Sequence, residues 1–162
     1  MDYPIKAPGP MEVSGGISLM IAGSILDSSL LAGFTRVAGD RVMYKTSCHC
    51  GNVEVIVPQL PLQIVQCNCS ICRRYGSLWG HYTRATASVK YQPESVVAYV
   101  WGDQVIEFYH CADCGCVTHY EGVDKTPEER LSINFRMFLP EVYSGVPIRL
   151  FDGAETWQFI DE

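Results

Sequence analysis

Eight cysteines are the residues of this chain that most clearly point to chemistry, because their spacing gathers them into groups. They occupy positions 48 and 50 in SCHCGN, positions 67, 69 and 72 in QCNCSICR, and positions 111, 114 and 116 in HCADCGC. Cysteines that recur at such short intervals are typical of metal sites. The question is which of the sulfurs meet at one point.

The stretch CADCG at residues 111–115 has the form of a zinc knuckle, a tight turn that aims two sulfurs at one point. Glycine after the second cysteine tolerates positive φ, which lets backbone N–H groups approach the thiolates. The natural second pair is Cys48 and Cys50, which is also followed by glycine. Together with Cys111 and Cys114 this pair would form a closed four-thiolate zinc site that stabilises the fold. The alternative is four unconnected buried cysteines.

Cys67, Cys69 and Cys72 remain as an independent set of three. Zinc held by three protein ligands with the fourth position free is typical of a catalytic site. The alternative is a second structural site, closed by a ligand from elsewhere in the chain. The candidates for that ligand are Cys116, His81 and His110. We interpret the set as an open, catalytic site.

The ligand type limits the chemistry of such an open site. Three thiolates make zinc a weak Lewis acid, which disfavours hydrolysis and suits the exchange of one sulfur ligand for another. The expected substrate is therefore a small-molecule thiol, held as the nucleophilic thiolate. Arg73 and Arg74 directly follow Cys72 and are candidates to pair with carboxylates of that thiol, although both would equally suit a solvated surface.

Composition places the chain among folded globular proteins and argues against several function classes. It has 162 residues, of which 48% are hydrophobic and 19% charged, which suits one ordinary domain. The net charge of −6 argues against nucleic-acid binding through phosphate neutralisation. The N-terminus lacks the basic start of a signal peptide, and Asp27 interrupts the apolar stretch near it, so we expect neither secretion nor a membrane span. The expected location is cytoplasmic, where paired cysteines hold metal more often than each other.

Two regions differ along the chain. Residues 1–42 contain no cysteine and place apolar residues at rough helical spacing around 17–34, which predicts an N-terminal extension with a helix that covers the core or forms a homodimer. Residues 43–162 are predicted to form the zinc-binding catalytic domain. Short segments rich in β-branched and aromatic residues fill it, namely NVEVIV, LQIVQ, SLWGHYT, SVVAYVW, VIEFYH and RLSINFRMF. We therefore expect a mainly β fold, either a small sandwich or a folded-over sheet.

Four segments, SCHCGNVEV, QCNCSICRRYGS, YHCADCGCVTHY and LSINFRMF, resemble in order and spacing the glutathione-dependent formaldehyde-activating enzymes, a family grouped with centromere protein V. The resemblance covers roughly residues 43–138. It implies the β-tent fold of folded antiparallel sheets around zinc. The two zinc sites it implies are Cys48, Cys50, Cys111 and Cys114 for one, and the catalytic Cys67, Cys69 and Cys72 for the other. Two residues depart from the family pattern: Asn68 replaces the usual histidine of the central motif, and Cys116 stands where the family often has threonine.

The implied activity is that of a carbon–sulfur lyase. Such an enzyme joins glutathione, as cosubstrate, to formaldehyde or a similar small carbonyl compound, giving S-hydroxymethylglutathione. Its partners would be these small molecules and two zinc ions per chain. Two alternatives come from other classes: a glutathione-binding or carrier protein without turnover, and a structural two-zinc interaction domain that dimerises through its N-terminal apolar stretch.

Overall fold

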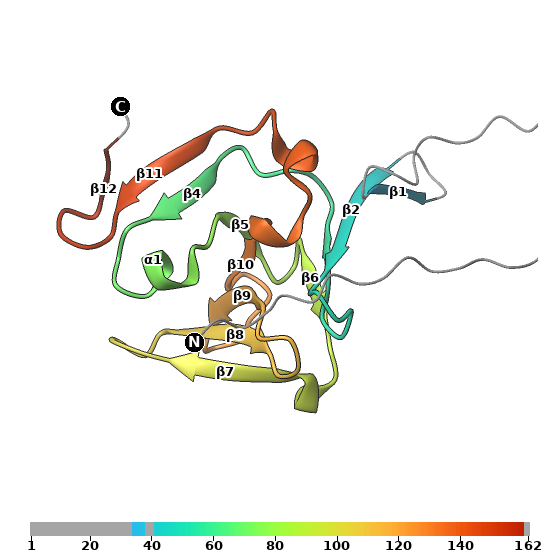
Figure 1. The fold of residues 1–162 in the computed structure, drawn as a ribbon, viewed down its shortest axis with the longest axis horizontal. Coiled ribbons are helices and arrows are strands. Elements are labelled where there is room, and N and C mark those ends of the chain that lie inside the picture. The colour runs from blue at the N-terminus through green and yellow to red at the C-terminus, as the bar shows by residue number, and fades with distance from the viewer. Residues whose placement is uncertain (1–33, 38–40, 161–162) are drawn as a thin grey trace, which may run out of the picture.

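Two β-sheets built from twelve strands make up the part of the chain that the computed structural model describes, residues 34–37 and 41–160 (Figure 1). The strands are β1 (Phe34–Val37), β2 (Arg41–Ser47), β3 (Glu54–Val57), β4 (Ile64–Cys67), β5 (Trp79–Thr83), β6 (Ser88–Lys90), β7 (Val96–Val100), β8 (Ile106–Cys111), β9 (Val117–Gly122), β10 (Arg130–Asn134), β11 (Ile148–Asp152) and β12 (Gln158–Phe159). The helical elements are the short helix α1 (Cys72–Tyr75) and the 3₁₀ turns η2 (Pro93–Ser95), η3 (Phe135–Met137) and η4 (Pro140–Tyr143). The expectation of a mainly β fold is confirmed.

The smaller sheet has the strand order β1-β2-β3-β6, and every neighbouring pair is antiparallel. The alternation in NVEVIV positions its side chains as predicted, because Val53, Val55 and Val57 are all fully buried. The sheet begins at Phe34, ahead of the domain boundary expected at residue 43. The helix predicted around 17–34 lies, apart from Phe34, outside the described residues.

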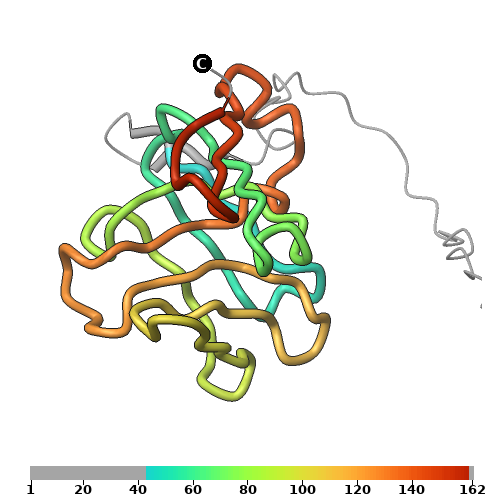
Figure 2. Tube along the Cα trace, turned by 90° about the vertical axis from the view of Figure 1, so that its left-hand side faces the viewer, coloured from blue at the N-terminus to red at the C-terminus, as the bar shows by residue number. Residues whose placement is uncertain are grey.

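The larger sheet has the order β12-β11-β4-β5-β10-β9-β8-β7. It folds over, so that β4 and β11 lie opposite β7 and β8, with α1 between these two parts (Figures 1 and 2). The sheet is not wholly antiparallel, because Ile148–Phe151 of β11 runs parallel to Ile64–Cys67 of β4. A parallel pair needs a long connection, and the chain between β4 and β11 passes through most of the domain. This pairing brings the end of β11 beside Cys67.

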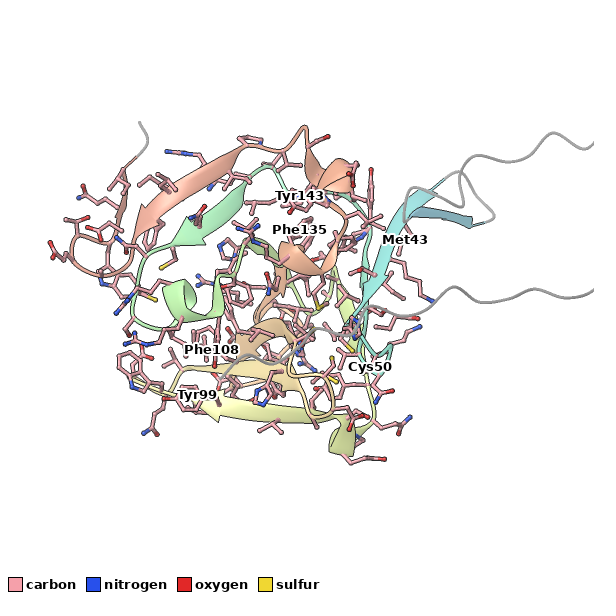
Figure 3. The ribbon with its side chains drawn as sticks, viewed as in Figure 1. Met43, Cys50, Tyr99, Phe108, Phe135 and Tyr143 are labelled. Atoms are coloured by element: carbon pink, nitrogen blue, oxygen red, sulfur yellow. The ribbon has the colours of Figure 1, made fainter. Side chains whose placement is uncertain are left out.

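The main core lies between the two sheets and contains valines of β3 together with the aromatic residues that follow β10. Phe135 and Tyr143 meet edge to face with ring centroids 5.8 Å apart, and both are labelled in Figure 3. Gly80 in β5 lies under Phe135, and a Cβ at this position would come within 2.3 Å of the ring. The glycine in SLWGHYT therefore makes room for the fully buried ring of Phe135.

The segments predicted from residue type as strands all contain strands, with one change at RLSINFRMF. β10 ends at Asn134, whose side chain accepts a hydrogen bond from the Arg136 N–H and caps the 3₁₀ turn η3. The strand pattern stops here because the asparagine offers the backbone a local partner. No helix in the described residues is long and apolar enough to cross a membrane.

Candidate metal centres and active site

The four-sulfur group consists of Cys48, Cys50, Cys111 and Cys114, and it links the two sheets. The first pair lies in the turn between β2 and β3 of the smaller sheet, and the second begins the turn between β8 and β9 of the larger one. The Sγ atom of Cys50 is 3.5 Å from that of Cys48 and 3.5 Å from that of Cys111. All four sulfurs lie within 4.8 Å of one another.

Each turn has the knuckle geometry predicted from its glycine. Gly51 and Gly115 adopt φ of 89° and 70°, and their N–H groups donate to the carbonyl oxygens of Cys48 and Cys111. The N–H of Val53 donates to the Cys48 sulfur at 3.3 Å. The backbone therefore supplies donors that favour thiolates at this point.

The donor set of this group fits zinc. A Zn–S bond of about 2.3 Å places the sulfurs of a tetrahedral site about 3.8 Å apart, close to the separations found here. The surroundings divide the four thiols: the N–H of Asn52 favours ionisation of Cys50, but burial and the hydrogen bonds with Cys111 and Cys48 outweigh it and raise the pKa of Cys50 to about 12, whereas Cys114 is favoured as a thiolate. Burial opposes ionisation of Cys114, yet the N–H groups of Cys116 and Cys50 outweigh it and lower the pKa of Cys114 to about 5. The four cysteines would hold the ion as a closed structural site.

The three-sulfur group consists of Cys67, Cys69 and Cys72, at the end of β4 and the start of α1. Its sulfurs also lie within 4.8 Å of one another, and no further His, Cys, Asp or Glu in the described residues joins them. The Cys69 N–H lies 3.4 Å from the Cys67 sulfur, and the buried Trp79 donates its indole N–H to the Cys72 sulfur at 3.2 Å. This donor set also fits zinc, with three protein ligands.

Ionisation within the three-sulfur group is uneven. A hydrogen bond from the Cys72 thiol and another from the Cys69 N–H lower the pKa of Cys67 to about 6, against the opposing effect of burial. The bond to Cys67 and burial raise the pKa of Cys72 well above its ordinary value. Cys67 is thus the sulfur that its surroundings favour as a thiolate.

The C-terminal hairpin of β11 and β12 packs against this group. Gly153 follows β11, and a Cβ there would lie 2.5 Å from the Cys67 sulfur, so only glycine fits without displacement. Asn68 ties the two segments together, because its side chain donates to Asp152 at 2.8 Å and accepts from the Ala154 N–H at 3.0 Å. The departure at Asn68 therefore has a structural role in this chain.

A pocket of about 300 Å³ opens beside Cys67 and Cys72. Two arginines, Arg73 and Arg136, are part of its lining, and no Asp or Glu of the described residues is. The Arg136 Nε donates to the Gly76 carbonyl at 3.2 Å, which holds this side chain against the end of α1. Of the two predicted arginines, Arg73 thus lies at the pocket beside the three-sulfur group.

The remaining candidates lie elsewhere. Arg74 donates to the Ser70 carbonyl at 2.6 Å and lines a different hollow, together with His110 and Cys116. Cys116 packs against the core cluster formed around the four-sulfur group. His81 in β5 shares a hydrogen bond of 2.8 Å with Ser132. None of the three candidates for closing the three-sulfur site joins it in the structure.

Sequence reasoning missed Gly153, Arg136 and Ser77, all of which approach the three-sulfur group or its pocket. Arg136 is a lone charge in the apolar run INFRMF, a signal that marks it as exposed but not as part of a site. Gly153 and Ser77 carry no local signal, because their positions depend on pairing between distant segments.

The family model for the glutathione-dependent formaldehyde-activating enzyme matches residues 43–138. A solved structure of a Rhodobacter sphaeroides protein is similar, with 27% sequence identity and a TM-score of 0.52, and the match covers 64% of this chain and 98% of that chain. No curated protein matches. The matched region contains all eight cysteines and more than half of the chain, so the chain belongs to the glutathione-dependent formaldehyde-activating enzyme family.

Proposed function

We propose that this chain is a zinc-dependent carbon–sulfur lyase that condenses glutathione with formaldehyde, or a similar small carbonyl compound, to S-hydroxymethylglutathione. The observation that carries the proposal is the pocket beside Cys67 and Cys72, which combines a three-sulfur group with the cations of Arg73 and Arg136. Glutathione has the matching parts, a thiol and two carboxylates. Family membership supports the same reaction class.

The reaction is an addition and needs no oxidant or reductant. The thiol sulfur forms a bond to the carbonyl carbon, the carbon–oxygen π bond breaks, and the thiol proton ends on the oxygen. Zinc bound by Cys67, Cys69 and Cys72 would supply the positive charge that keeps an incoming thiol ionised at neutral pH. The chain itself fixes the geometry, since Trp79 and the Cys69 N–H hold two of the sulfurs in place.

The aromatic side chains behind the group exclude water from one side of it. Trp79 packs edge to face on Tyr120 with ring centroids 4.8 Å apart, and Phe108 lies 5.2 Å from Tyr120. A wall of aromatic side chains that excludes water strengthens the attraction between arginines and a bound anion, because the local dielectric constant is low.

We also propose a cytoplasmic location, because all eight cysteines are free thiols in the structure.

The test is the rate at which glutathione and formaldehyde combine, followed by NMR exchange spectroscopy. The wild type is expected to exceed the spontaneous rate, and Cys69→Ser is expected to fall to it. Cys116→Ser, a cysteine outside both sulfur groups, serves as the matched control and should keep the activity. Equal rates for wild type and Cys69→Ser would overturn the proposal, and glutathione binding without acceleration would select a carrier function.

A further inference from the structure

Ser77 has a buried hydroxyl group without a hydrogen-bond partner. The residue is 2% exposed, and in the described residues its Oγ is the only buried side-chain nitrogen or oxygen without a partner. It follows Gly76, the left-handed residue that ends α1, and its own N–H donates to the Cys72 carbonyl at 3.4 Å. A buried hydroxyl normally finds a partner, because leaving one unpaired costs roughly 1–3 kcal/mol. The missing partner therefore requires an explanation.

The surroundings of Ser77 indicate what that partner would be. Ser77 lines the same pocket as Cys67, Cys72, Arg73 and Arg136. Arg136 is held at the residue before Ser77 by its bond to the Gly76 carbonyl, which uses one of its five guanidinium donors. A serine with a free hydroxyl donor and two arginines that line one pocket can together form a site for an anion with several acceptor oxygens. A carboxylate has this form.

We propose that Ser77, Arg73 and Arg136 form a carboxylate subsite, in which the Ser77 hydroxyl donates to one oxygen of the thiol cosubstrate's carboxylate. The inference rests on the proposed function, because it assigns a role to a second part of the same cosubstrate. Ser77 is then a residue that determines specificity. It favours thiols with a carboxylate near the sulfur over neutral thiols, which would leave the hydroxyl unpaired.

The chain offers a clean way to separate this role from a structural one. Removing a hydroxyl that has no partner leaves no new unpaired group, so Ser77→Ala should fold as stably as the wild type. Ser132 is the matched control, since it is also fully buried but shares a hydrogen bond with His81. Ser132→Ala should lower the melting temperature and leave ligand binding unchanged.

The experiment is calorimetric titration of the zinc-loaded protein with glutathione and with glutathione diethyl ester, without formaldehyde. Ser77→Ala is expected to weaken glutathione binding about tenfold, a loss of one hydrogen bond to a charged group. Arg136→Met should weaken it at least as much. The diester should bind the wild type and Ser77→Ala equally weakly, because it presents no carboxylate to either.

Two results would overturn the subsite. One is unchanged glutathione affinity in Ser77→Ala, including the case in which the wild type does not bind glutathione at all. The other is an equal loss for glutathione and its diester, which would mean that the hydroxyl does not recognise a carboxylate. Failure of the proposed reaction has a different signature: the binding contrast between Ser77→Ala and wild type persists, but formaldehyde addition is not accelerated.

Discussion

The two sulfur groups of this protein are built differently although they use the same atoms. The four-sulfur group joins two distant turns, one from each sheet, and its core residues Cys48 and Cys111 are buried. The three-sulfur group lies on one continuous stretch of chain, from Cys67 to Cys72, and faces a pocket with two arginines. Figure 3 shows Cys50 at the foot of β2, away from Phe108, which packs with the second group.

The number of sulfurs alone therefore does not separate a structural centre from a functional one. A centre that links two sheets contributes its binding energy to folding, because neither sheet can hold the ion alone. A centre on one local stretch of chain contributes little to holding distant segments together. With three protein ligands, it leaves the fourth coordination position of the metal for a ligand. We therefore expect damage to the first group to appear in stability, and damage to the second in activity.

The largest effect is expected from Cys111→Ser. Cys111 is fully buried between the sheets, and losing it would forfeit much of a metal contribution of roughly 10 kcal/mol, as large as the stability of a typical domain. The variant should be unfolded at 25 °C by circular dichroism and should lose zinc. Cys69→Ser, by contrast, should keep a cooperative unfolding transition. If both variants melted alike, the assignment of separate roles would be wrong.

A smaller loss of stability is expected from Asn134→Ala. The buried Asn134 accepts hydrogen bonds from the N–H groups of Leu78 and Arg136 and donates to the Val117 carbonyl at 2.8 Å. Removing it leaves three backbone groups without their partners, the buried N–H of Leu78 among them, at a cost of about 3 kcal/mol, and loosens the turn that carries Arg136. Denaturant unfolding measures the change.

The matched control for this variant lies beside the four-sulfur group. The exposed Asn52 bonds to the exposed Asp113, so Asn52→Ala should cost less than about 1 kcal/mol. Similar losses for the two asparagines would contradict the view that Asn134 is a central support of the pocket.

Much of the two sulfur groups could be predicted from sequence because their signals are local. The spacing of Cys111 and Cys114, and the glycine after them, specify a knuckle without reference to the rest of the chain. The buried alternation of Val53, Val55 and Val57 is likewise encoded in six residues. Even the pairing of the two distant cysteine turns can be predicted, since two sulfurs fill only half of a tetrahedral zinc site and need a second pair.

The rest of the site depends on long-range pairing that local patterns do not encode. Gly153 touches the three-sulfur group only because β11 runs parallel to β4, and nothing in IRLFDG predicts that partner or its direction. Arg136 reaches the pocket because β10 ends at Asn134 and turns. Ser77 could not be predicted either, since the lack of a hydrogen-bond partner is a property of its surroundings in the fold rather than of its neighbours in sequence.

Gly153→Ala tests whether the C-terminal hairpin positions the three-sulfur group. The added methyl group would lie 2.5 Å from the Cys67 sulfur and 3.3 Å from the Cys69 Cβ, so the loop must shift. Overpacking of this kind costs about 1–2 kcal/mol, and displacement of a ligand should lower the formaldehyde–glutathione rate at least tenfold. Gly145→Ala, which meets nothing within 4 Å, is the control and should retain both stability and activity. Full activity of Gly153→Ala would mean that the hairpin does not position Cys67.

The smallest effect is expected from Asn68→Ala, and it is best measured as a pKa. Hydrogen bonds from the Asn68 side chain, and then from Thr156, lower the pKa of Asp152 to about 2. Without the amide, the pKa of Asp152 should rise part of the way to its ordinary value of 3.8, which carboxyl NMR titration can follow.

The sign of the pH dependence follows from linkage. A carboxyl whose pKa is depressed by folding contributes stability above its unfolded pKa, and this contribution is lost as the pH falls through about 2. Wild type should therefore be slightly more stable than Asn68→Ala at pH 5, and the difference should narrow with falling pH down to the point at which acid releases zinc from its thiolates. Because Asn68 lies between two ligands of the three-sulfur group, its loss should also lower activity modestly, while zinc at the four-sulfur group stays in place. A stability difference that does not narrow with falling pH would show instead that Asn68 supports the loop without acting through Asp152.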